Sequence, residues 1–417
     1  MRVLNKSELI AEELASGIRR GVLTGKLISE KELAKKYSTA VMTAARALNI
    51  LREQNLVERI SGRGTFVISR SVRRLRFFRQ SYFAGLQAKL LGSLVPNVEL
   101  VPVSSFLESD LAVFATTMPM NYSSNFLPWP TQMVESLKAS GRFYPQVFEF
   151  HHIGTPTYAV AYNFSPDILA YNKRLMRQAA PEFDPYQFTF DELAKLSQQL
   201  PGRFMERPAA GNSILFALAY SSASLRRALP AFRRLLFTAP EPGKSFLHGD
   251  YLLAPLTRAH CFNFSDFSPF EVMPIPEIDG VRCCHAASEA VFVPLSSRYP
   301  ELAFELAAAS LSLPFQEAVG AARANIPADI SIAAESLDSR AFRDDIFFNE
   351  IANIHFPREI IDPVSAAVIL AGLKRLASCA CSLDDFLCLL EEEEHLVQRR
   401  RKALAFVLQT QNCAESF

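Results

Sequence analysis

Residues 27–67, LISEKELAKKYSTAVMTAARALNILREQNLVERISGRGTFV, decide the fold of the N-terminal part of this chain. Ser29 and Glu32 have the spacing of a capping box, in which each side chain accepts a hydrogen bond from a backbone N–H left open at a helix start. This spacing predicts a short helix, and after a break Ser38 or Thr39 can cap a second one. Two short helices joined by a tight turn make the helix-turn-helix layout.

A β-hairpin is predicted directly after these two helices. Residues 56–60 favour a strand, residues 61–64 (Ser-Gly-Arg-Gly) a tight turn, and residues 65–68 the returning strand. Upstream, residues 4–23 carry apolar side chains at a four-residue spacing, which indicates an amphipathic helix: Ile10, Leu14, Ile18 and Val22. The hairpin is therefore expected to be the wing of a winged helix-turn-helix domain.

Charge is distributed unevenly along the chain. Residues 1–70 hold 13 Lys and Arg against 7 Asp and Glu, a net of +6, whereas the whole chain has a net charge of only +1. The remainder is therefore slightly acidic, with a net of −5. A basic head on an acidic body suits a head that contacts phosphates and a body that does not.

Three features of the sequence indicate the cellular compartment in which this protein is expected. Its first residues are charged, so no apolar secretory signal is predicted, and no apolar run approaches the ~20 residues that span a bilayer. The seven cysteines include no C-x-x-C pair, which argues against a zinc site or a small disulfide framework. These features favour a reduced, cytoplasmic environment.

Two phrases in the head carry a resemblance to a known family. LISEKELA (residues 27–34) and GRGTFV (residues 62–67) resemble the DNA-binding domain of the GntR family of bacterial transcription regulators. The resemblance implies binding to a double-stranded DNA operator, with the second helix in the major groove and the wing close to the backbone. The candidate DNA-binding residues are Lys31, Lys35, Met42, Thr43, Arg46, Asn49, Arg59, Gly62, Arg63 and Gly64.

The start of the predicted reading helix departs from the family pattern. Where the family usually has Ser-Arg and, one turn later, Val-Arg, this chain has Ala40-Val41 and Ala44-Ala45. Two expected arginines are thus missing, and an Arg–guanine pair is worth roughly 1–3 kcal/mol of discrimination between bases. We therefore expect an operator unlike the usual one; weakened DNA binding is the alternative.

Beyond a basic link at residues 71–76, the pattern alternates between strands and helices. Such alternation predicts α/β packing with a mainly parallel sheet. We expect strands at residues 75–78, 98–103, 110–114 and 158–162, and helices at residues 83–94, 165–179 and 190–200. Thr189 and Glu192 form a second capping box at the start of the last of these helices.

The body also resembles a known family. TYAVAYNFSPDILAYNKRLMRQA (residues 157–179) followed by FTFDELAKLSQQL (residues 188–200) looks like the middle of the extracellular solute-binding proteins of sugar-importing ABC transporters. The resemblance implies a type II periplasmic-binding fold, in which two α/β lobes close on a ligand. We therefore expect a winged helix-turn-helix domain (residues 1–70), a linker (residues 71–76) and a two-lobed, ligand-sensing α/β domain (residues 77–417).

In such a cleft, aromatic faces, carboxylates, amides and hydroxyls hold a sugar. By their position in the resembled motifs, the candidate ligand-binding residues are Tyr82, Thr117, Asn163, Asp250, Tyr251 and Glu289. The predicted function is a transcription regulator that binds its operator as a homodimer under the control of a small polar effector, with a carbohydrate favoured. The alternative is a body that has lost its ligand and serves as a dimerisation or protein-interaction module.

Catalysis is not predicted. The adjacent pair His151-His152 diverges in an extended segment, and His285 beside Cys283-Cys284 does not by itself give the geometry of a nucleophile and its base. No G-x-G-x-x-G, G-x-x-x-x-G-K-[ST] or H-E-x-x-H motif occurs. We therefore expect no cofactor and no metal. An exported transport component is disfavoured by the missing signal segment and by the basic head.

Overall fold

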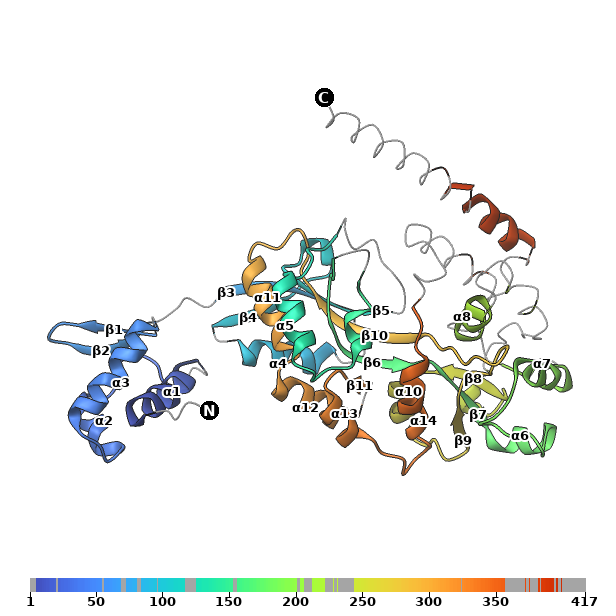
Figure 1. Ribbon diagram of the computed structural model, residues 1–417, viewed down its shortest axis with the longest axis horizontal. Coiled ribbons are helices and arrows are strands. Elements are labelled where there is room, and N and C mark those ends of the chain that lie inside the picture. The colour runs from blue at the N-terminus through green and yellow to red at the C-terminus, as the bar shows by residue number, and fades with distance from the viewer. Residues whose placement is uncertain are drawn as a thin grey trace. The chain divides into compact units, whose positions relative to one another are not determined.

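The computed structural model (Figure 1) describes most of the chain, which divides into two compact units. One unit comprises Met1–Ala112 with Ser296–Phe315, and the other comprises Val113–Leu295 with Gln316–Phe417. The residues described are 5–19, 22–54, 56–68, 73–80, 84–95, 97–116, 125–152, 156–200, 203–205, 212–221, 228, 231, 244–323, 325–356, 372, 375, 382, 384–393, 395–396 and 399.

Helices and strands alternate through most of the described residues. The helices are α1 (Lys6–Arg19), α2 (Glu30–Lys36), α3 (Val41–Glu53), α4 (Ala84–Leu94), α5 (Thr131–Ala139), α6 (Lys173–Ala179), α7 (Phe190–Gln199), α8 (Asn212–Ser221), α10 (Arg258–Asn263), α11 (Pro300–Ala309), α12 (Leu313–Ala321), α13 (Ile330–Ser336) and α14 (Asp345–Asn349). The strands are β1 (Val57–Ile60), β2 (Gly64–Val67), β3 (Arg73–Gln80), β4 (Val98–Pro102), β5 (Leu111–Thr116), β6 (Ala161–Pro166), β7 (Ile168–Asn172), β8 (Leu253–Leu256), β9 (Phe270–Met273), β10 (Ala286–Phe292) and β11 (Ile326–Pro327).

The head is a winged helix-turn-helix with its own core. In Figure 1, α1, α2 and α3 pack together and the β1–β2 hairpin extends beyond them. The core contains Leu33 of α2 and Leu48 and Leu51 of α3, each at most 1 % exposed. The expected apolar face of α1 is confirmed at Leu14, but Val22 is 73 % exposed because the helix ends at Arg19.

One of the two predicted caps in the head is confirmed. Ser29 and Glu32 form a reciprocal capping box at the start of α2. Neither Ser38 nor Thr39 caps α3, whose N-cap is Ala40 with no side-chain hydrogen bond. Both residues serve the turn instead, since Ser38 takes a left-handed φ of 46° and the Thr39 N–H donates to the last turn of α2. The prediction of a polar cap there was wrong.

The wing has the predicted hairpin geometry. Strands β1 and β2 pair antiparallel in a register that sets Val57 opposite Val67 and Ile60 opposite Gly64. At the tip, Gly62 has a φ of +72° and Gly64 a φ of +111°, conformations that L side chains rarely adopt. The glycines are therefore required by the turn itself.

The larger sheet of the body has the strand order β11-β6-β10-β5-β3-β4. β3 and β4 pair in parallel, and β3 begins at Arg73, inside the stretch expected as a linker. By contrast, β6 pairs antiparallel with both β10 and β11. The expectation of a mainly parallel sheet stays a prediction for the β10–β5 and β5–β3 pairings, but it fails at β6, which runs against both of its neighbours. The reason is connectivity: the chain leaves this sheet along β6, enters a second sheet at β7, and returns along β10.

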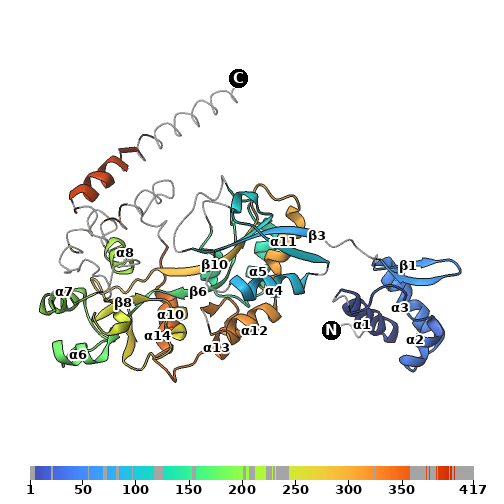
Figure 2. The ribbon, with the colours of Figure 1, turned by 180° about the vertical axis from the view of Figure 1, so that it is seen from behind.

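The second sheet has the order β8-β7-β9, with both pairings antiparallel, and Figure 2 shows it with α6 and α7 alongside. The helix predicted from residue 165 begins only at Lys173, where the Asn172 side chain caps α6. Ser165 does not cap a helix because its hydroxyl oxygen accepts the backbone N–H of Arg258 at 2.9 Å, so the segment before Asn172 stays extended. The Thr189–Glu192 capping box of α7 is confirmed.

Candidate nucleic-acid interface and ligand site

Helix α3 presents one face to the core and another to solvent. Ala44, Ala47 and Leu48 are buried in the head, each at most 1 % exposed. Met42, Arg46 and Asn49 follow one another at helical spacing on the other side, with Met42 85 % exposed, Arg46 exposed and Asn49 half-buried. These three predicted residues thus form a single outward stripe along α3, which we call the reading stripe.

The other predicted DNA contacts in the head also lie at the surface. Thr43 is half-buried, whereas Lys31 and Lys35 of α2 and Arg63 at the wing tip are exposed. Arg63 is held in the turn by its backbone N–H, which donates to the Ile60 carbonyl at 3.0 Å. Its guanidinium therefore extends from a fixed backbone, next to the two glycines of the tip.

Arg59 differs from the other basic residues because a carboxylate already engages it. Its guanidinium forms an ion pair with Glu30 at the start of α2. The two side chains are about one-third exposed. Arg59 thus ties the wing to α2, a positioning role that sequence reasoning missed because the two residues lie far apart in the chain.

The turn of the helix-turn-helix is fixed to α1. The Tyr37 hydroxyl donates to Glu13 Oε1 at 2.7 Å, and Lys6 Nζ donates to the Ser38 carbonyl at 3.0 Å. Burial and, next, the hydrogen bond to Glu13 raise the pKa of Tyr37 to about 12. The phenol therefore remains a donor over the whole physiological pH range, and α1 and α2 keep their mutual orientation.

In the body, the structure brings together two predicted ligand residues, Asn163 and Glu289. They face each other across the β6–β10 pairing, and each is 1 % exposed. Glu289 Oε2 accepts hydrogen bonds from Asn163 Nδ2 at 2.9 Å and from the Tyr162 hydroxyl at 3.0 Å. Asn325 Nδ2 donates to Asn163 Oδ1 at 3.3 Å, while Asn325 Oδ1 is buried without a hydrogen-bond partner. The side chains of this network therefore hydrogen-bond to one another, and Asn325 Oδ1 is the acceptor that has no partner among them.

The remaining predicted ligand residues lie elsewhere. Tyr82 and Thr117 fall outside the described residues. Asp250 follows Gly249, whose left-handed φ of 78° ends a short 3₁₀ helix (Phe246–His248), and its side chain accepts the Ser245 backbone N–H at 3.0 Å. Tyr251 is 2 % exposed. Both residues thus shape the entry to β8.

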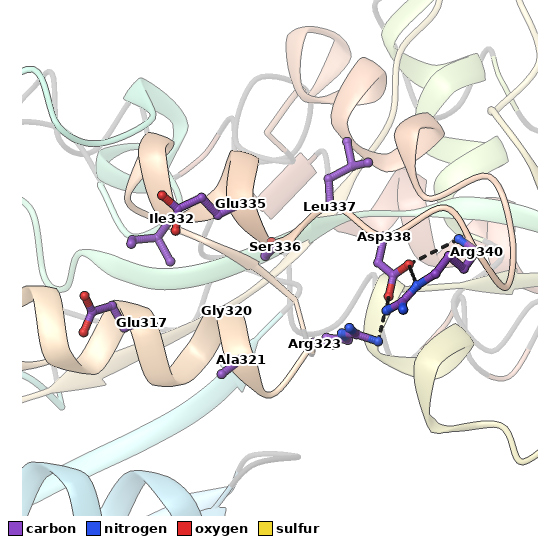
Figure 3. A pocket seen from close by; sticks show the side chains of 10 residues that line it. All are labelled: Glu317, Gly320, Ala321, Arg323, Ile332, Glu335, Ser336, Leu337, Asp338 and Arg340. Atoms are coloured by element: carbon purple, nitrogen blue, oxygen red, sulfur yellow. Dashed lines mark hydrogen bonds and ion pairs between the residues drawn. The ribbon is translucent and has the colours of Figure 1, made fainter.

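A polar pocket lies beside α12 and α13, with a volume of about 490 Å³ (Figure 3). On one side Asp338 forms ion pairs with Arg323 at 2.6 Å and with Arg340 at 2.5 Å. The hydrogen bond from the Arg340 guanidinium lowers the pKa of Asp338 well below its usual range. Glu317 and Glu335 lie further along the pocket wall. No motif in the sequence marks these residues, which only the fold brings together.

The structure gives no support to the nucleophile considered at Cys283-Cys284-His285. Cys284 is fully buried, and burial followed by the nearby Glu350 raises the pKa of its thiol well above the ordinary value. His285 Nδ1 lies 3.1 Å from Asp167 Oδ2. Within the described part of the chain, no cluster of three or more His, Cys, Asp or Glu side chains is suited to a metal ion.

The head and body together define a class: a winged helix-turn-helix joined to a periplasmic-binding-protein-like α/β domain. Residues 6–67 match the model of the bacterial regulatory proteins of the gntR family. A comparison with curated proteins found no match. Among the described residues, no helix has the length and apolar character needed to cross a membrane.

Two solved structures that are similar to this chain are an ABC substrate-binding protein and a sugar-binding protein. The ABC substrate-binding protein Lmo0181 from Listeria monocytogenes, solved with cycloalternan, has 13 % identity and a TM-score of 0.63, covering 78 % of this chain and 98 % of its own. The sugar-binding protein MalE from Xanthomonas citri has 15 % identity and a TM-score of 0.61, covering 80 % and 99 %. At these identities the likeness shows the fold of the body, as the sequence predicted.

Proposed function

We propose that this chain is a cytoplasmic transcription regulator that binds a DNA operator as a homodimer and whose affinity for it is controlled by a carbohydrate. The observation that carries the proposal is the union, in one chain, of a gntR-type head with a body folded like sugar-binding proteins. The exposed reading stripe and the glycine-tipped wing support DNA binding by the head. The proposed division is residues 1–70 for the head, 71–76 for the linker, whose last residues from Arg73 on already belong to β3, and 77–417 for the sensor.

Control requires that the ligand bind two arrangements of the protein with different affinities. A ligand shifts an equilibrium only by that difference, typically ~1–3 kcal/mol, or about 5- to 150-fold in operator affinity. The proposed ligand contacts are those predicted from the sequence, of which Asp250 and Tyr251 lie at the entry to β8. The chemistry expected of the ligand is that of a polyhydroxylated molecule, matched by carboxylate, amide and aromatic groups.

The test has two stages, both on the full chain. Selection of bound duplexes from a random pool should yield an enriched operator, and its affinity should then change at least about five-fold with one member of a sugar panel. The same sugar should raise the free energy of unfolding by about 2.7 kcal/mol at 100 times its Kd. If no duplex is enriched, the proposal that the chain is a transcription regulator is refuted. If an operator is enriched but no solute changes the affinity for it, only the proposed sensing role of the body is refuted.

A second candidate for the body is a dimerisation or interaction module without a ligand. The observation that favours it is the network in which Glu289 accepts hydrogen bonds from Asn163 and Tyr162, because these groups bond one another rather than facing an open site. Under this candidate the chain still binds its operator and still self-associates. No sugar then changes either the operator affinity or the free energy of unfolding.

A further inference from the structure

The reading stripe begins with an apolar side chain that the head does not use for packing. Met42, at 85 %, has the largest exposed fraction among the large apolar side chains of the described residues, and the preceding Val41 is 44 % exposed. Together they form an apolar tip on the first turn of α3. Burying a methionine side chain stabilises a protein by roughly 1.5–3 kcal/mol relative to leaving it exposed. At this position of α3 the folded head does not gain that free energy.

The surroundings of this apolar tip are compatible with a nucleic acid. The first turn of α3 contains no acidic residue, and its N-cap, Ala40, makes no side-chain hydrogen bond to the backbone. The first turn of α3 itself therefore presents neither a carboxylate that would repel a phosphate backbone nor a capping side chain. Further along the same face, Arg46 is exposed and Asn49 is half-buried.

In a helix-turn-helix the second helix enters the major groove with its N-terminal residues toward the base edges. The 5-methyl group of thymine is the one apolar group that a base pair presents there, and apolar side chains contact it. Methionine is unbranched and polarisable, so it adapts to such a surface. Arg46 and Asn49 supply the polar contacts that suit guanine and adenine.

We propose that Met42, assisted by Val41, sets the operator specificity of this chain by packing against thymine methyl groups in the major groove. This inference rests on the proposed function, because it assigns the residue that reads the operator. It places thymine in each half-site next to the bases contacted by Arg46 and Asn49. The discrimination lost with an arginine–guanine pair is replaced by methyl contacts.

The experiment exchanges thymine for uracil, which removes only the methyl group. An operator is selected from a random pool with the full chain, and each thymine of a half-site is then replaced singly by deoxyuridine. At the thymines under α3 the affinity should fall about four-fold per methyl group. The Met42→Ala chain should bind the thymine and uracil duplexes equally, and Met42→Leu should retain the difference.

Leu9→Ala is the matched control, because Leu9 is an apolar residue of α1 that is 54 % exposed. It should keep the full preference for thymine, and all three variants should unfold at the same temperature as the parent. An enriched operator that tolerates uracil at every position would overturn the inference while leaving the regulator intact. If the exchange of thymine for uracil weakens binding equally in Met42→Ala and in the parent, the inference is also overturned and the proposed regulator is left intact. The apolar tip would then point to a protein partner. A pool without enrichment would overturn the proposed function and the inference together.

Discussion

Replacing Glu289 by alanine tests whether the buried network that Glu289 forms with Asn163 and Tyr162 stabilises the fold or binds a ligand. The carboxylate accepts hydrogen bonds from Asn163 Nδ2 at 2.9 Å and from the Tyr162 hydroxyl at 3.0 Å, in a region 1 % exposed or less. Taking an acceptor from a buried donor costs about 1–3 kcal/mol. Loss of the acceptor for these donors, Asn163 Nδ2 and the Tyr162 hydroxyl, therefore predicts a loss of roughly 2–6 kcal/mol in the free energy of unfolding.

Urea unfolding of the ligand-free chain measures this loss, with Glu335→Ala as the matched control. Glu335 is exposed on the wall of the polar pocket, and its removal should change the stability by less than about 0.5 kcal/mol. Equal stability of the two variants would refute the reasoning. If Glu289→Ala instead leaves the ligand-free stability unchanged and abolishes a sugar-induced shift, Glu289 is a ligand contact, as predicted from the sequence.

Three further predictions concern the head and the body. Arg63→Ala should weaken binding to all duplexes alike and reduce the slope of log affinity against log salt by about one, as measured by titration; a change confined to one sequence would contradict a phosphate contact. Asp344→Ala should cost about 3–5 kcal/mol in urea unfolding, because Arg258 and Asp344 are both 0 % exposed and paired at 2.7 Å; a cost below about 1 kcal/mol would contradict this. The pKa of Tyr37 is about 12, above the unfolded value of about 10, so its contribution to stability is complete below pH ~10 and is lost as the pH rises toward 12; a Tyr37→Phe variant that follows the parent through this range would contradict it.

The features that could be predicted from the sequence depend on contacts within a few residues. The capping boxes at Ser29 and Thr189 need only a hydroxyl and a glutamate three positions apart, and both are present. The wing needs glycine at a turn whose φ is positive, and Gly62 supplies it. The head and the family of folds for the body followed from such local patterns and from the motifs that they form.

Predictions failed where a residue that could cap a nearby helix has another role in the folded chain, such as a hydrogen bond to a distant residue or a place in a turn. Ser165 has the appearance of a helix cap, but its hydroxyl oxygen accepts the N–H of Arg258, 93 residues away. Ser38 precedes a helix, but the backbone uses it for the turn. Local propensity is worth about 1 kcal/mol, and a buried hydrogen bond to a distant group is enough to override it.

The sequence by itself determined the winged head, the alternation of helices and strands in the body, and the residue types offered to DNA. Only the tertiary structure decided that Asn163 and Glu289, 126 residues apart, are hydrogen-bonded to each other, and that Met42 is left outside the core. The reason is that capping and turn formation act between neighbouring backbone groups. Strand register and burial depend on the packing of segments far apart in the chain, which no local pattern specifies.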